Sequence, residues 1–230
     1  MITAIARGLI PLGTAGLMLA GCSDPKAPSK ANFKAAINKW GETSPVCFAL
    51  PDGDVKAAGA DDKPFPIYVD QSPSRNAFDL QNRKRLQDRL DTLVAAGALR
   101  ASAETIKVKL YFSFDNKLND LQVRAYNLSD EGTKALRRDV SPFGDHGRWP
   151  SLCYGTPTVD EIVEFSEPNS AMGMTVSEVS YTYHLKDVPS WARDARINQA
   201  FPEIAKAKVP GRTGKTSVIL MNDGWKDSRH

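Results

Sequence analysis

The chain has 230 residues, of which 41% are hydrophobic and 25% charged, and its formal net charge at pH 7 is +3. These proportions are ordinary for a globular protein, and the nearly even charge balance argues against a nucleic-acid-binding protein. Beyond the first 20 residues, no apolar run is long enough to cross a bilayer.

The first 22 residues, MITAIARGLIPLGTAGLMLAGC, carry one basic residue, Arg7, and then an apolar run from Gly8 to Ala20. A bilayer-spanning helix needs about 20 apolar residues, so this run is too short to be one. A basic start, a short apolar stretch and small residues before a polar segment are typical of a secretory signal peptide. We therefore predict a signal peptide over residues 1–21.

The end of this run, Leu19-Ala20-Gly21-Cys22, resembles the lipobox of bacterial lipoprotein precursors. The resemblance implies acylation of Cys22, cleavage before it, and a lipid-anchored protein of the cell envelope whose partner is the membrane. Ser23 favours the periplasmic face of the outer membrane, while Asp24, one place later, leaves the inner membrane open. Residues 22–31 are predicted to be a lipidated, flexible tether, because they are polar and contain two prolines.

With Cys22 assigned to lipid by this resemblance, Cys47 and Cys153 remain. Export would place them in an oxidising compartment, where an even pair favours a disulfide. The alternative is two separate buried thiols. A catalytic thiol is disfavoured, because no His or Asn is evidently dedicated to activating one.

The first half of the chain alternates predicted helices and strands. A helix from Asn32 to Trp40 should end at Gly41, and short strands should follow over 46–50 and 65–69. The clearest helix is predicted over 79–96, with Gly97 after its end. Strands over 106–114 and 121–128 and a short helix capped by Ser129 complete this part.

The order of elements over 79–138 resembles the winged-helix family, and it implies a winged-helix-like domain, predicted over 32–140. The matching residues are Leu90, Leu93, Gly97, Leu99, Tyr126, Leu128, Ser129 and Gly132. In that family a basic helix contacts DNA, but an exported lipoprotein does not meet nucleic acid. The basic residues, with one aromatic, are instead a candidate surface for lipid phosphates or an acidic partner, and the alternative is a solvated helix face. They are Arg83, Lys84, Arg85, Arg89 and Trp191.

Prolines and glycines over 139–150 predict a boundary before a second domain at 141–230. Strands are predicted over 158–166, 176–186 and 216–221, with a helix after Pro189. A small antiparallel sheet with this helix packed on one face is the simplest arrangement, so the chain is predicted to be α+β.

No zinc, nucleophile or complete phosphate-loop motif is present, and we predict neither a metal nor a cofactor. The sequence therefore favours a non-enzymatic binding or scaffold protein. One alternative is an envelope hydrolase acting on peptidoglycan or lipid, with candidates in Asp145, His146 and the acidic group Glu161, Glu164 and Glu167. The other is an immunity or inhibitor lipoprotein, which would need a strongly charged complementary face.

Overall fold

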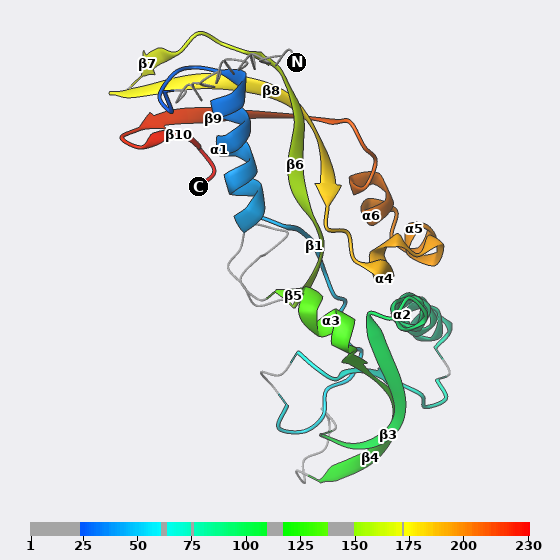
Figure 1. The fold of residues 1–230 in the computed structure, drawn as a ribbon. Coiled ribbons are helices and arrows are strands. Elements are labelled where there is room, and N and C mark those ends of the chain that lie inside the picture. Colours follow the sequence, from blue (N-terminus) through cyan, green and yellow to red (C-terminus); the bar gives the residue numbers. More distant parts are fainter. Residues whose placement is uncertain (1–23, 61–63, 75, 110–116, 138–149, 172) are drawn as a thin grey trace, which may run out of the picture.

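The computed structural model in Figure 1 describes residues 24–60, 64–74, 76–109, 117–137, 150–171 and 173–230. In this part of the chain, helices and strands are mixed, and the strands form two antiparallel sheets. The α+β class is therefore as predicted. The signal peptide predicted over 1–21, Cys22, Asp145 and His146 lie outside the described residues.

The larger sheet has the strand order β1-β6-β8-β9-β10, with two short strands added at its sides. β5 (Leu136–Arg137) pairs with β6, and β7 (Asn169–Ala171) pairs with β8. The five strands of the main order are β1 (Val46–Ala49), β6 (Ser151–Phe165), β8 (Met174–Lys186), β9 (Arg212–Met221) and β10 (Gly224–Asp227).

Helix α1 (Lys30–Thr43) lies across this sheet (Figure 1). Its buried residues, Phe33, Ala36 and Ile37, form a core together with residues of β6, β8, β9 and β10. Ser29, not Asn32, caps the helix, accepting from the backbone N–H of Asn32. The predicted end at Gly41 is wrong, because the helix continues to Thr43 and Gly41 instead permits close packing on β6.

Two bulges in β6 change which of its residues face the core. The pairing with β8 shifts register between Val159 and Glu161, and again between Ile162 and Glu164. Val159 and Ile162 are consequently both buried, whereas Val163 is 51% exposed. A regular strand would place Val159 and Val163 on the same face, and the bulges remove that alternation.

The smaller sheet has the order β2-β4-β3. Its strands are β2 (Ile67–Asp70), β3 (Leu99–Lys109) and β4 (Leu118–Leu128). Helix α2 (Ala77–Ala95) packs against this sheet through the fully buried Leu90 and Leu93. The predicted helix and the cap of α3 (Asp130–Ala135) by Ser129 are confirmed, and β2 lies at an edge of the sheet.

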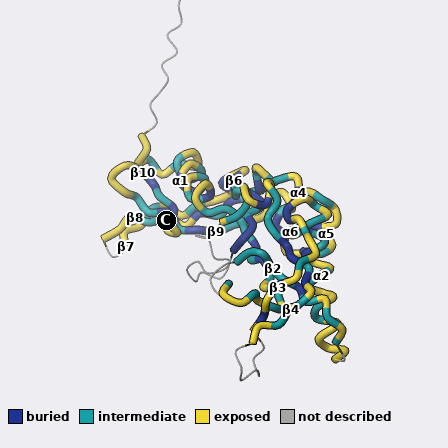
Figure 2. Tube along the Cα trace, turned by 90° about the horizontal axis from the view of Figure 1, so that it is seen from below, coloured by how far each residue is buried: buried dark blue, intermediate teal, exposed yellow. Residues whose placement is uncertain are grey.

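Three short helices lie between β8 and β9 in the chain and pack where the two sheets meet. They are α4 (Ser190–Arg193), α5 (Ala195–Ala200) and α6 (Pro202–Ala207). They do not lie across the larger sheet as predicted; α5 contacts α2, and the buried residues of all three share one core with β1, β2, β6 and α2. In Figure 2 the buried positions continue from β6 towards the strands beside α2.

The winged-helix expectation is not supported. α1, which precedes the matching segment, packs on the larger sheet, and the segment itself forms a three-stranded sheet with two 11-residue strands. The pattern misled because any amphipathic helix followed by a hairpin places leucines and glycines at similar spacings. The elements predicted as one domain over 32–140 are thus shared between both sheets.

Candidate functional site

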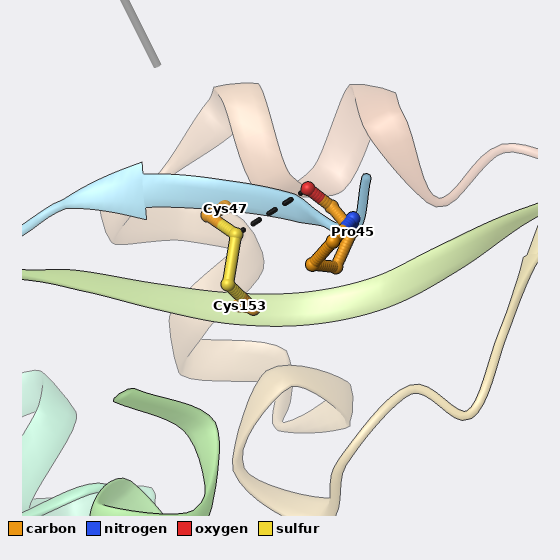
Figure 3. Close-up of a disulfide and its surroundings, with 3 residues drawn as sticks. All are labelled: Pro45, Cys47 and Cys153. Atoms are coloured by element: carbon orange, nitrogen blue, oxygen red, sulfur yellow. Dashed lines mark hydrogen bonds between the residues drawn. A yellow bond between two sulfur atoms is a disulfide. The ribbon is translucent and has the colours of Figure 1, made fainter. Parts of the chain in front are cut away.

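Cys47 and Cys153 form a disulfide between β1 and β6, as predicted from the cysteine count (Figure 3). The two residues are direct partners in the antiparallel pairing, with their Cα atoms 3.8 Å apart. Cys47 Sγ also lies 3.4 Å from the carbonyl oxygen of Pro45. Because an oxidised sulfur carries no proton, that approach is a packing contact and not a hydrogen bond.

The first described residues are held firmly on the folded protein. The carbonyls of Asp24 and Ala27 both accept from the side-chain amide of Asn32, at 2.9 and 2.8 Å. The indole N–H of Trp225 donates to the carbonyl of Lys26 at 3.0 Å, although 199 residues separate them. From Asp24 onward the chain therefore differs from the flexible tether predicted over 22–31.

Arg83, the first residue of the predicted basic surface, is part of the structural framework. Its guanidinium bonds Asp54 at 3.0 Å and Asp70 at 2.8 Å, and also the carbonyl of Ser72. The Arg83 side chain is only 18% exposed, so these contacts are partly shielded from water. Arg83 thus joins α2 to β2 and to the loop before it.

The other members of the predicted basic surface have local partners. Lys84 pairs with Asp88 on the same helix, and Arg85 donates to Asn82. Arg89 lies over the ring of Phe201 and 3.6 Å from Glu203, which links α2 to α6. Of these three, only Lys84 and Arg85 extend from the helix without a contact to another element among the described residues.

Trp191, the aromatic candidate, is fully buried and cannot contact a partner. Its ring packs 6.0 Å from that of Phe48 in the core shared by both sheets. Its indole N–H finds no acceptor among the described residues. The apolar spacing around α4 is equally compatible with a core and with a surface position, so the sequence could not separate them.

The acidic residues proposed for catalysis lie along a solvated strand. Glu161, Glu164 and Glu167 are all exposed, and Glu164 accepts from Ser180. His184, also on the exposed side, places Nδ1 2.6 Å from Asp160 Oδ1, and each side chain is about 40% exposed. This arrangement is an ion pair or hydrogen bond across two strands; no third group completes a nucleophile site among the described residues.

A buried carboxylate that the sequence did not reveal lies near the end of the chain. Asp227 has a fully buried side chain and binds Arg229 through both carboxylate oxygens, at 2.8 and 2.6 Å. Thr216 donates to the same carboxylate, and the Arg229 guanidinium stacks 3.5 Å from the ring centre of Trp40. The cluster fixes β10 and the chain end against α1, so its role is structural.

An exposed arginine next to tyrosines, on the larger sheet, is the best candidate for ligand contact. Arg212 is exposed and lies 5.7 Å from the ring centre of Tyr183. Nearby, burial and the charge of Glu203 raise the pKa of Tyr154 to about 12, against a smaller opposing effect of Arg212. A cation on an aromatic surface suits an anionic group.

Among the described residues, no helix is long and apolar enough to span a membrane, and no three metal-binding side chains gather into a site. Compared with known protein families, curated proteins and solved structures, the chain matches none.

Proposed function

We propose that this chain is a lipoprotein of the cell envelope, anchored through Cys22 at the periplasmic face of the outer membrane, and that it acts as a non-enzymatic binding or scaffold protein. The observation that carries the proposal is the Cys47–Cys153 disulfide in a chain with a lipobox-like segment. Disulfides persist in oxidising compartments, which is where a lipoprotein would be exported. Two independent features of the sequence and structure thus favour the same destination.

Binding is favoured over hydrolysis by the surroundings of the acidic residues. Glu161, Glu164 and Glu167 are exposed to solvent along β6 and the turn after it. Catalytic carboxylates act best in a site that excludes water, and these exposed positions provide none. Arg212 and Tyr183, by contrast, present a cation and an aromatic ring that can bind an anionic partner, and such binding requires no catalytic group.

The anchor is tested by mass spectrometry of the protein purified from its own membranes. We expect a mature chain that begins at Cys22, carries acyl groups there and contains the intact disulfide. A Cys22→Ser variant should lose the acyl mass and leave the membrane fraction. A chain that retains residues 1–21 and carries no lipid would contradict the proposal.

The binding role is tested by crosslinking in intact cells with two matched variants of β9. Arg212 faces Tyr183 on one side of the sheet, whereas Lys215 lies on the other side of the same strand. We expect Arg212→Ala to lose crosslinked products that wild type and Lys215→Ala retain. Identical products in all three proteins would remove Arg212 from the binding surface.

A further inference from the structure

Helix α1 covers one side of the larger sheet, and the other side is open. Along the open side, the outward residues change from polar to apolar. Val179, Tyr181 and Val218 face α1. The alternate residues of β8 and β9 therefore face away from α1. Over most of the sheet these outward residues are polar: Glu178, Ser180, Thr182 and His184 on β8, and Thr213, Lys215 and Ser217 on β9.

At one end of that open side, four apolar residues replace the polar ones. Val176 pairs with Ile219, and two residues further along each strand stand Met174 and Met221. Met174 and Met221 are each 47% exposed. We name these four residues the apolar end patch. Lys226, opposite Ile219 on β10, stands at its side.

The chain begins its described course beside the turn from β9 to β10, at the same end of the larger sheet as this patch. Gly224 pairs with Met221, and a Cβ added to Gly224 would lie 3.1 Å from the carbonyl oxygen of Pro25. Asp24 precedes Pro25, and Cys22 stands only two residues before Asp24. Since an extended residue spans at most about 3.6 Å, Cys22 lies within roughly 7 Å of chain from Asp24.

We propose that the apolar end patch rests on the lipid bilayer to which Cys22 is anchored, so that the folded protein is held on the membrane surface in a fixed orientation. The inference rests on the lipid anchor proposed above. It adds that the bilayer is a contact surface of the fold, with Met174 and Met221 in the interfacial layer. The hairpin of β3 and β4, in the other sheet, then extends away from the anchored end (Figure 1).

Two arguments favour a membrane over a protein at this patch. The short link from the lipid confines the patch near the bilayer, so a weak apolar contact is sufficient there. A stable protein interface instead needs about 20–30 residues on each side, many more than the patch offers. Lys26, exposed at the start of the chain, is also placed near lipid phosphates by the same link.

The test places a benzophenone amino acid at single positions of the full, lipidated chain in vesicles of phosphatidylethanolamine and phosphatidylglycerol. Positions 174 and 221 lie in the patch. Positions 182 and 213 are controls on the same open side, about 25 Å further along the strands. After irradiation, we expect phospholipid adducts at 174 and 221 to exceed those at 182 and 213 at least about fivefold, because confinement near the bilayer raises the local lipid concentration.

A second variant tests the short link. A Gly/Ser linker of about 15 residues inserted between Ser23 and Asp24 should lower the adducts at 221 severalfold, because it frees the fold from the surface. Equal adducts at the patch and control positions, or crosslinks from 221 to a protein, would overturn the membrane contact. The acyl mass of the Cys22 peptide from the same sample separates the two proposals. If Cys22 carries no acyl group, both the anchor and the membrane contact are wrong. If Cys22 is acylated, the crosslinking result tests the membrane contact alone.

Discussion

The indole N–H of Trp225 donates to the carbonyl of Lys26 at 3.0 Å, so the last strand of the fold holds the residues that precede α1. A Trp225→Phe variant retains an aromatic ring but loses this donor. A single hydrogen bond of this kind contributes about 1 kcal/mol to stability. We therefore expect a local loosening of residues 24–27 more than global unfolding.

Hydrogen exchange measures this loosening directly. The amides of Lys26 and Ala27, which bond Asp24, should exchange faster in Trp225→Phe. The amide of Val159, which bonds Asn38 in the second half of α1, is the internal control and should keep its rate. Unchanged exchange at Lys26 and Ala27 would show that other contacts suffice to hold the segment.

The disulfide should contribute substantially to stability, because it joins residues separated by 106 positions. For a closed loop of about 100 residues, the chain-entropy account gives about 4.7 kcal/mol, and measured losses are typically about 2–5 kcal/mol. We expect urea unfolding of Cys47→Ser/Cys153→Ser to show a loss in that range. Wild type under reducing conditions should behave like the variant, and a difference between them would indicate an effect of the serines themselves.

Arg83 and Lys84 are neighbours in a basic run, yet they should differ strongly on substitution. Arg83 binds two partly buried aspartates, and removing it leaves both without their cation. Breaking such a pair costs up to about 3 kcal/mol, whereas an exposed pair such as Lys84–Asp88 contributes about 0.5 kcal/mol or less. Urea unfolding of Arg83→Gln and Lys84→Gln measures the contrast, and equal losses would contradict it.

Local patterns predicted those elements whose stability is mostly local. The α2 helix has an apolar face and Gly97 after its end, with a positive φ of 88°, and the Ser129 cap has its own partner three residues on. The strand β8 alternates regularly, so Val179, Tyr181 and Leu185 are buried as their period of two requires. The disulfide was predictable because the number of cysteines and the expected oxidising compartment were enough to infer it.

Long-range packing decided the rest. Gly41 was predicted to end a helix, but it is required where α1 meets Pro157. Gly214, in β9, is required in the same way because it lies under the ring of Tyr181. Likewise, the first bulge of β6 lies where Lys34 and Asn38 of α1 bond its backbone. A single sequence does not indicate which distant residue a glycine or a bulge will contact.

Asp194 provides a pH-dependent test. Hydrogen bonds from the side chain and then the backbone N–H of Arg196 lower the pKa of Asp194 to about 2. A carboxylate with a lowered pKa stabilises the fold above its unfolded pKa, and this contribution disappears as the pH falls through the folded value. Asp194→Asn should therefore melt below wild type above about pH 4, and the two should converge towards about pH 2. Thermal melts over this range measure the difference, and a gap that is constant with pH would rule out the charge as its cause.

The close packing of α1 on β6 predicts a large effect of one methyl group. A Cβ at position 41 would lie 2.4 Å from the carbonyl oxygen of Pro157, a backbone atom that cannot rotate away. Overpacking of this kind costs about 1–3 kcal/mol, which exceeds the gain of about 1 kcal/mol from the higher helix propensity of alanine. Gly41→Ala should thus destabilise the protein, although the same change stabilises a free helix. Glu42→Ala, at an exposed position one residue later, is the matched control and should change the urea midpoint little. A Gly41→Ala protein as stable as wild type would show that α1 does not approach Pro157 this closely.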